Sequence, residues 1–568
     1  MTPATPRMSA ATFSRRLGAG PAIGPGPAYR LLADRIRGAV LDGRLSVSSG
    51  LPSERDLATG LAVSRTTVAA AYALLREEGW LESRRGSGSR LRLPSAATEQ
   101  TGRGIGPAGL FGHPAPGRED EIDLATASLP APIAALQRAV AAAVDDLPRH
   151  AAGRGYSPFG IPALRHAIAQ HYCASGVPTA AEQILVTSGA QHAFTLAVQE
   201  LSAPGDRVMV ECPTYPVALD AVRGARRIPD PIGLPGPDSG HVEPWDCDLI
   251  SAAMRQTAPR LAYLIPDFQN PTGALMSEET RQRIVRVAQA SNTLLLIDES
   301  FRDVPFPGHE HLPPRMAAFD NGLRVLSLGS LSKSVWGGLR IGWIRGASAI
   351  IDRLATSRAL GDMSGPVLEQ LIAVHLLADP QDAFDHQRRR LSDGAAVLSR
   401  ALAERLPSWR TSDPHGGGSL WVALPGPFAT EMARLAHTVG VRIAPGPRFG
   451  PDGTMESYLR LPFTQPPDTL ITAVQRLASV AERPAGRRRS DLPGWLARGS
   501  SPNSDRPASS GRGLRCLQPV LIWEVCGASI TQVFPGLKGS GFPAESVNRN
   551  GSVLVPRFQD PSKACPSR

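Results

Sequence analysis

Apolar residues recur with helical spacing in three short stretches near the start of the chain. Leucine, isoleucine and valine recur every four positions over residues 28–43 and predict one helical face that ends at a glycine. A second helix is predicted within 51–63, where Ser53 precedes Asp56 by the three residues typical of a capped helix start. A third helix is predicted from Ser64 onward, with a polar first turn.

A glycine-centred turn between two short alternating runs follows at residues 80–93 and predicts a β-hairpin. Three helices followed by a basic hairpin are typical of a winged helix-turn-helix, which we place at residues 28–94. The flanking segments differ in composition. Residues 1–27 are rich in Pro, Gly, Ala and Ser and are expected to be disordered, and residues 95–120 have the composition of a linker.

The long central region, residues 121–482, alternates helical patterns with short apolar runs. Runs such as QILVTSG, LAYLIPDF, TLLLIDES and RVLSLGS predict strands, and their alternation with helices indicates an α/β domain around a mostly parallel sheet. Several of these strands end in polar or small residues, at the edge where open α/β sheets bind ligands. Residues 483–568 have a low-complexity composition and are expected to be disordered.

The charge of the chain is unevenly distributed. The formal charge is +10, yet residues 1–94 carry 14 basic and 7 acidic side chains and residues 482–568 carry 13 and 6, so the centre is slightly acidic. A basic head on a slightly acidic body favours a module that binds a polyanion. No apolar run reaches membrane-spanning length, the N-terminus lacks the apolar core of a secretory signal, and no cysteine spacing is typical of a metal site. We therefore expect a cytoplasmic protein with no membrane contact and no metal.

Lysine is nearly absent from the chain. Of 61 basic residues only Lys333, Lys538 and Lys563 are lysines, so the first 537 residues hold a single primary-amine side chain. Arginine replaces lysine in salt bridges and phosphate contacts, but its guanidinium stays protonated and does not form Schiff bases. Lys333 is therefore a candidate for covalent chemistry, unless codon bias spared one lysine by chance.

Lys333 directly follows an apolar strand and has hydroxyls, glycines and an arginine around it in SLGSLSKSVWGGLRIGW. An aldehyde cofactor that bears a phosphate requires this combination of groups. The amine of Lys333 would form the Schiff base. Ser330 and Arg340 would bind the dianionic phosphate, the arginine through two parallel hydrogen bonds.

Other strand ends carry groups suited to the same cofactor. Asp298 ends LLLIDES and would keep a pyridine nitrogen protonated, although capping a helix is the commoner role for such an aspartate. Asn270 lies in the tight turn of DFQNPTG with an amide for a phenolic oxygen, and Tyr215 in ECPTYP offers a ring for stacking. Backbone N–H groups at a helix start in VTSGAQHAF offer a further phosphate site, formed by Ser188, Gly189, Ala190 and Gln191.

The first turn of the third helix, SRTT, has the residue types that base readout requires. In a helix-turn-helix this turn faces base edges in the major groove. Arg65 is long enough to reach guanine O6 and N7, and the hydroxyls of Ser64, Thr66 and Thr67 suit phosphates or bases. The alternative is that SRTT only caps a helix. Contacts to the DNA backbone or the minor groove are expected from Arg55, Arg85 and Gly86.

The segment 28–93 resembles the GntR family of bacterial regulators almost element by element, including LPSERDLA, VSRTTV and YALLREEGWLESRRGSG. A double-stranded DNA operator is the partner that this resemblance implies. The resemblance implies that DNA is contacted by Arg55, Ser64, Arg65, Thr66 and Gly86, and also by Thr67 and Arg85.

Together and in this order, the motifs of residues 121–480 resemble fold-type I aminotransferases, which bind pyridoxal 5'-phosphate (PLP). The resemblance implies that Tyr156 in GRGYSPFG reaches the phosphate of a neighbouring subunit, so a homodimer is expected. It implies that Arg460 in SYLRLPF binds a substrate carboxylate. It also implies the cofactor roles of Lys333 (Schiff base), Asp298 (pyridinium), Asn270 (phenolate), Tyr215 (ring stacking), and Ser330 with Arg340 (phosphate).

A GntR head joined to this body is the pattern of the MocR subfamily. One departure is Phe301 in DESF, where many aminotransferases have a tyrosine that bonds the phenolic oxygen, and this puts transaminase activity in doubt. Three hypotheses remain: a regulator that senses vitamin B6 or an amino compound, a working aminotransferase with secondary DNA binding, and a regulator with a cofactor-free body. The intact motif residues weigh against the third, and the complete head together with Phe301 favours the first.

Overall fold

A computed structural model describes most of the head and nearly all of the central region. The expected linker, apart from Asp120, and the tail at 483–568 lie outside the described residues. The described residues are 8–17, 27–41, 44–45, 47, 50–84, 88–94, 120–236, 243–320, 324–451 and 453–481.

The head consists of four helices and a hairpin. Ser53 and Ser64 act as the N-caps of the third and fourth helices, and each hydroxyl accepts a hydrogen bond from the backbone N–H three residues later, at 3.1 and 3.0 Å. The apolar face predicted for residues 28–43 is buried, with Ile36 and Val40 fully inaccessible. The elements are α1 (Ala10–Leu17), α2 (Ala28–Leu41), α3 (Glu54–Leu61), α4 (Arg65–Glu77) and the antiparallel strands β1 (Leu81–Arg84) and β2 (Gly88–Leu91).

The expectation that residues 1–27 are disordered is wrong for Ala10–Leu17, which form helix α1. Phe13 and Leu17, four residues apart on one face of α1, are buried in the apolar core of the head. Proline and glycine dominate the composition around this segment and conceal the short apolar face, so composition alone is misleading here.

The central region contains a seven-stranded sheet that confirms the predicted α/β fold. Only β10 runs antiparallel to its neighbours, and the other strands are mutually parallel. Alternate residues of each central strand face opposite sides, so that Leu295 and Ile297 enter one core while Leu294 and Leu296 enter the other. The strand order is β4 (Ile184–Thr187), β10 (Gly342–Arg345), β9 (Val325–Ser330), β8 (Leu294–Asp298), β7 (Leu261–Leu264), β5 (Arg207–Cys212) and β6 (Ile228–Gly233).

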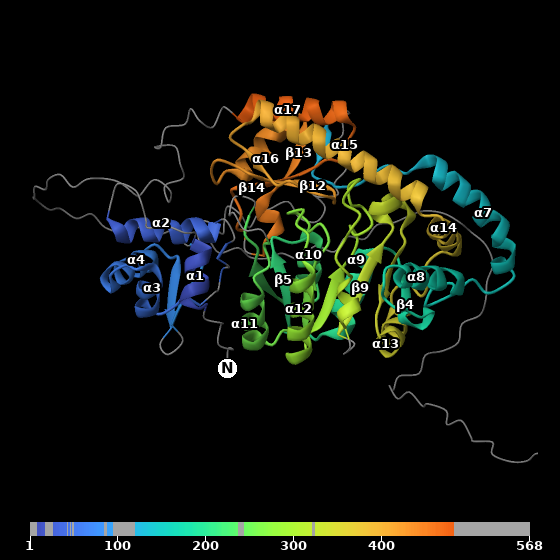
Figure 1. The fold of residues 1–568 in the computed structure, drawn as a ribbon, viewed down its shortest axis with the longest axis horizontal. Coiled ribbons are helices and arrows are strands. Elements are labelled where there is room, and N and C mark those ends of the chain that lie inside the picture. The colour runs from blue at the N-terminus through green and yellow to red at the C-terminus, as the bar shows by residue number, and fades with distance from the viewer. Residues whose placement is uncertain are drawn as a thin grey trace, which may run out of the picture. The chain divides into compact units, whose positions relative to one another are not determined.

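Helices cover both faces of this sheet, as its two separate cores require (Figure 1). Within the described residues, no helix is long and apolar enough to cross a bilayer. The helices of this part are α7 (Ile133–Ala151), α8 (Pro162–Ala174), α9 (Ala190–Leu201), α10 (Pro216–Gly224), α11 (Cys247–Thr257), α12 (Glu278–Ala290), α13 (Ser348–Arg358) and α14 (Val367–Ala378).

A second, five-stranded sheet has its own core together with the long helix α15 (Gln381–Arg405), which lies beside α17 (Pro467–Ala481), and α16 (Ala429–Thr438) packs against α17 (Figure 1). Its first strand comes from far away in the sequence, because residues 122–124 pair in parallel with 441–443. Because of this pairing, the segment just after residue 124 lies near the carboxyl ends of the strands of the large sheet. The order is β11 (Arg410–Thr411), β12 (Ser419–Ala423), β14 (Tyr458–Pro462), β13 (Val441–Pro445) and β3 (Ile122–Leu124).

Candidate cofactor pocket and DNA-reading surface

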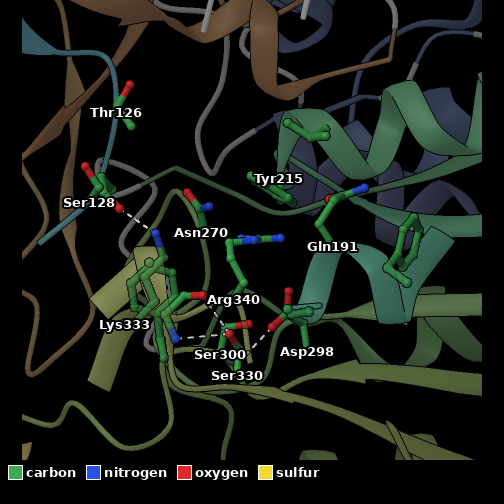
Figure 2. A pocket seen from close by; sticks show the side chains of 18 of the residues that line it. Thr126, Ser128, Gln191, Tyr215, Asn270, Asp298, Ser300, Ser330, Lys333 and Arg340 are labelled. Atoms are coloured by element: carbon green, nitrogen blue, oxygen red, sulfur yellow. Dashed lines mark hydrogen bonds between the residues drawn. The ribbon is translucent and has the colours of Figure 1, made fainter. Parts of the chain in front are cut away.

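A cavity of about 360 Å³ lies at the carboxyl ends of the large sheet, where its strands deliver the predicted groups (Figure 2). Residues from the small sheet complete its wall, so that positions as distant as 126 and 460 meet in one space. Ten of the predicted residues line the cavity: Gly189, Ala190, Gln191, Tyr215, Asn270, Asp298, Ser330, Lys333, Arg340 and Arg460.

Lys333 lies in a single π-helical turn, Ser332–Trp336, immediately after β9. Such turns are rare and recur at functional sites. Its Nζ donates a hydrogen bond to the carbonyl of Ala127 and lies 5.6 Å from the centre of the Phe301 ring. Burial, and next the positive charge of Arg460, lower the pKa of Lys333 to about 8. A substantial fraction of the amine is therefore neutral near physiological pH, as a nucleophilic lysine requires.

Asp298 ends β8 and points into the cavity. One carboxylate oxygen accepts a hydrogen bond from the backbone N–H of Ser300 at 2.9 Å, and the other accepts one from the hydroxyl of Tyr263 at 2.6 Å. The residues after Asp298 form turns, so this aspartate does not cap a helix. The helix-capping role considered for Asp298 from the sequence is therefore excluded.

Arg460 extends from β14 and is almost fully buried, with an exposure of 3%. One Nη donates to Asn270 Oδ1 at 3.3 Å, another to the carbonyl of Ala125, and the guanidinium lies over the Phe449 ring at 5.0 Å. Burial lowers the pKa of Arg460 to about 10. Within the described residues its Nε has no hydrogen-bond partner, and the Asp123 carboxylate acts on the guanidinium through its charge alone. A buried cation in this state suits an anionic ligand.

A second anion site lies at the start of α9. Gly189 has φ +98 before the first helical residue, and a side chain at this position would come within 3.2 Å of Arg340 Nη2. The Arg340 guanidinium donates to the carbonyl of Ser188, which itself does not line the cavity. The hydroxyl of Ser330 bonds to Ser332 and to the carbonyl of Ile341. Helix N–H groups and a guanidinium thus converge on one small, open space.

The two predicted tyrosines differ in their placement. Tyr215 precedes α10 and lines the cavity, and burial raises the pKa of its phenol to about 12. Tyr156 does not line the cavity and is 68% exposed. The subunit that contains this pocket therefore leaves the Tyr156 ring available at its surface.

The predicted DNA-reading turn is exposed at the start of α4. Arg65 has a side-chain exposure of 74%, and its nearest acidic partner is Glu54 at 3.9 Å. Ser64 caps the helix and also remains at the surface, so capping and exposure of this turn occur together. Arg55, Thr66 and Thr67 are likewise exposed or partly exposed, whereas Arg85 and Gly86 lie outside the described residues.

Two family models match the two parts of the chain. Residues 119–477 match the aminotransferase class I and II model, which covers more than half of the chain. The chain belongs to the aminotransferase class I and II family. Residues 28–91 match the model of bacterial regulatory proteins of the gntR family, so the family domain here is joined to a helix-turn-helix, as in the MocR subfamily.

Two proteins named as regulators are similar to this chain over most of their length. The chain is 28% identical over 430 residues to the probable rhizopine catabolism regulatory protein MocR of Rhizobium meliloti, covering 70% of this chain and 81% of that protein. It is 28% identical over 400 residues to the HTH-type pyridoxine biosynthesis transcriptional regulator PdxR of Corynebacterium glutamicum, covering 68% and 81%.

A solved aminotransferase structure confirms the fold of the central region. The α-aminoadipate aminotransferase LysN of Thermus thermophilus, complexed with N-(5'-phosphopyridoxyl)-L-leucine, aligns with a TM-score of 0.58 and 26% identity, covering 64% of this chain and 93% of that one. The fold of the central region is therefore shared with this aminotransferase.

Some residues that line the pocket of this family member have no clear signal in the sequence. Tyr263 sits in the apolar run LAYL, which predicts only a buried strand. A buried phenol needs a hydrogen-bond partner, and this requirement is the signal in the sequence that could have identified Tyr263. The pairing of β3 with β13 places three more residues in the pocket wall, Thr126, Ala127 and Ser128. No local sequence pattern predicts this pairing.

Proposed function

We propose that this chain is a PLP-dependent transcription regulator that binds a DNA operator and senses vitamin B6 status or an amino compound. The observation that carries the proposal is the union, in one polypeptide, of a helix-turn-helix with an exposed polar reading turn and a pocket that keeps its cofactor-binding side chains. Two proteins named as regulators, MocR and PdxR, align with 70% and 68% of this chain, which supports the proposal.

The residues of the pocket fit PLP. The Lys333 amine would bind the aldehyde carbon, Asp298 would bond the ring nitrogen, and the Asn270 amide would bond the phenolic oxygen. The oxygen of that amide already accepts from Arg460, so its N–H groups are the ones left to donate. Tyr215 offers its ring for stacking. When bound, PLP supplies an electron-withdrawing ring that activates an amine attached to it.

The phosphate of PLP would occupy the space between the start of α9 and Arg340. The guanidinium of Arg340, the hydroxyl of Ser330 and the backbone N–H groups of Gly189, Ala190 and Gln191 surround this space. Ser188 contributes through its carbonyl, which holds Arg340, rather than by lining the site.

If the signal is an amino compound, the effector is an amine that also carries a carboxylate. Arg460 supports this choice, because it is a buried guanidinium that lacks an acidic hydrogen-bond partner within the described residues and lines the same cavity as Lys333. An effector carboxylate would satisfy the Arg460 guanidinium, while the effector amine would displace the Lys333 amine from the cofactor. The freed Lys333 changes the local charge and packing.

On the DNA side, Arg65 reads a guanine edge, and Ser64, Thr66 and Thr67 bond phosphates or bases from the same helical turn. The helix dipole of α4 adds attraction for phosphate at this end. Phosphate or minor-groove contacts are assigned to Arg55, Arg85 and Gly86.

The working unit is a homodimer. Tyr156 is 68% exposed, and two apolar residues of the segment after α13, Leu360 and Met363, are 92% and 52% exposed. Contiguous exposed apolar surface marks sites that bind a partner, and Leu360 and Met363 lie only three residues apart in the sequence. A second copy of the chain would cover them and bring its own Tyr156 to the phosphate of the first.

A working aminotransferase is the second candidate. The completeness of the set formed by Lys333, Asp298, Asn270 and Arg460 favours it, since all four line one cavity. Phe301 weighs against it, because no hydroxyl stands at that position to bond the phenolic oxygen, and Tyr263 directs its own hydroxyl to Asp298.

The test is footprinting on the DNA that flanks the gene for this chain, with apoprotein, with PLP, and with PLP plus amino acids. A regulator protects a defined site, and cofactor or effector changes the protection. Transfer of the amino group to a keto acid, with protection unchanged by any ligand, would instead establish the enzyme.

A further inference from the structure

We propose that Tyr263 is a positioning residue whose hydroxyl fixes the carboxylate of Asp298 and thereby sets how tightly PLP is held and at what pH its chromophore titrates. This inference rests on the proposed function, because it assumes that Asp298 meets the ring nitrogen of PLP. It concerns a residue outside the set that sequence motifs single out.

The strand register places the two side chains together. Tyr263 of β7 pairs with Leu296 of β8, and Asp298 lies two residues further along the same strand. Residues two apart on a strand share a face, and diagonal neighbours on adjacent strands are within reach of a long aromatic side chain. The Tyr263 hydroxyl accordingly lies 2.6 Å from Asp298 Oδ2.

The Tyr263 ring is held in one orientation. It is 1% exposed and packs edge-to-face on Phe194, with ring centres 4.6 Å apart. Burial, and next the negative charge of Asp298, raise the pKa of Tyr263 well above its ordinary value, so the phenol remains protonated and acts as a donor. A fixed donor of this kind also fixes the acceptor.

Each oxygen of the Asp298 carboxylate therefore has one donor, Ser300 N–H on Oδ1 and Tyr263 on Oδ2. The first belongs to the backbone and the second to a side chain, so only the second can be removed by substitution. Hydrogen bonds to a carboxylate favour its ionised form. Without the phenol, a proton shared between Asp298 and the ring nitrogen would move toward the carboxylate.

The consequence concerns the cofactor. A ring nitrogen with less positive charge repels a proton at the Schiff-base nitrogen less strongly. The pH at which the bound chromophore titrates would then rise, and PLP would be held less tightly, because the charged contact between Asp298 and the ring is weaker.

The chain offers a matched control. Tyr172 is also fully buried, and its hydroxyl also donates to a carboxylate, Glu299 Oε2 at 2.8 Å, yet it does not line the cavity. The variants Tyr263→Phe and Tyr172→Phe each remove one buried phenol–carboxylate hydrogen bond, and Tyr172→Phe also removes the acceptor of the Trp343 indole N–H at 3.1 Å, so it is the more disruptive of the two. If the Tyr263 hydroxyl had only a structural role, both variants would change PLP affinity and the chromophore titration in the same way.

The experiment measures PLP affinity and the pH titration of the bound chromophore in full-length protein. Tyr263→Phe is expected to raise the Kd for PLP about tenfold and to shift the titration midpoint up by about one pH unit, and Tyr172→Phe to change neither. In the Asp298→Asn background, adding Tyr263→Phe should produce no further shift, because the partner is already altered.

A second variant keeps the shape of the side chain. With 3-fluorotyrosine at position 263, the phenol is a stronger donor, so the midpoint is expected to move down. Wild-type protein that binds no PLP would overturn the proposed function. Normal PLP binding with equal behaviour of Tyr263→Phe and Tyr172→Phe, or with no downward shift for 3-fluorotyrosine, would overturn only the role of Tyr263.

Discussion

The two functional regions of this chain are built in opposite ways. The proposed reading surface of the head is contiguous, since residues 64–67 lie in one helical turn that is exposed or partly exposed. The pocket of the body is dispersed, since its wall draws on residues from 126 to 460 and on both sheets. The first can be recognised from a short stretch of sequence. The second depends on which strands pair.

Their arginines show the same contrast in energetic terms. Arg65 is 74% exposed and has a distant acidic partner at 3.9 Å, an ion pair that contributes little in water and is easily exchanged for DNA. Arg460 is buried, and the described residues give it carbonyl and amide acceptors but no acidic hydrogen-bond partner. Such a cation gains far more from an arriving carboxylate.

The largest expected effect is on the body. Lys333→Ala should abolish the borohydride-reducible link between PLP and the protein, because Lys333 is the only primary-amine side chain in the first 537 residues. Reduction followed by peptide mapping measures this. Circular dichroism and thermal unfolding of the same variant serve as the control for folding. Label on any other residue would contradict the assignment of Lys333.

The matching change in the head should be smaller. Arg65→Ala is expected to weaken operator binding by about 1–3 kcal/mol and to relax base preference, because it removes contacts to a base edge. Binding to operator and random duplexes measures both effects. Arg85→Ala is the comparison variant, and it should mainly reduce the dependence of binding on salt. Unchanged discrimination in Arg65→Ala would remove Arg65 from the reading surface.

The pH dependence of PLP attachment separates the buried Lys333 amine from an ordinary one. Because burial lowers the pKa of Lys333 to about 8, the neutral fraction should rise about tenfold between pH 7 and 9 and then level off. For a lysine with an ordinary pKa, the neutral fraction would rise about a hundredfold over this interval and would continue to rise at higher pH. Stopped-flow absorbance on apoprotein gives the rates, and a continued rise above pH 9 would show that the Lys333 amine is not perturbed.

The smallest expected effect is that of removing residues 484–568. The described body ends in α17 at Ala481, and the residues that line the pocket all lie between 126 and 460. Affinities of the truncated protein for PLP and operator should equal those of the full chain in parallel titrations. Loss of soluble protein on truncation would show instead that this segment packs on the body.

Local pattern predicts much of the architecture. The caps at Ser53 and Ser64, the hairpin and the parallel strands all follow from short-range signals, and the structure has each of them. Helix α1 is not predicted, because the surrounding segment is rich in proline and glycine and the apolar face of the helix is short. The strand β3 escapes it because its partner lies more than 300 residues away, where no local periodicity reaches.

The same division applies within the pocket. Lys333, Asp298 and Asn270 stand at strand ends or in turns with distinctive neighbours, so the sequence singles them out. Tyr263 lies inside a strand, and its role depends on the register between β7 and β8, which only the folded sheet reveals. Residues that act by holding another residue are the hardest to find in this way.

One titration tests the central claim, that the pocket controls the head. Amino acids are added to PLP-loaded protein on a labelled operator while cofactor absorbance and DNA anisotropy are followed together. An effector should change both signals with one midpoint, since it moves the DNA equilibrium only through its differential affinity for two states, and Arg460→Ala should abolish both responses. An absorbance change with DNA affinity constant at every concentration would contradict the claim.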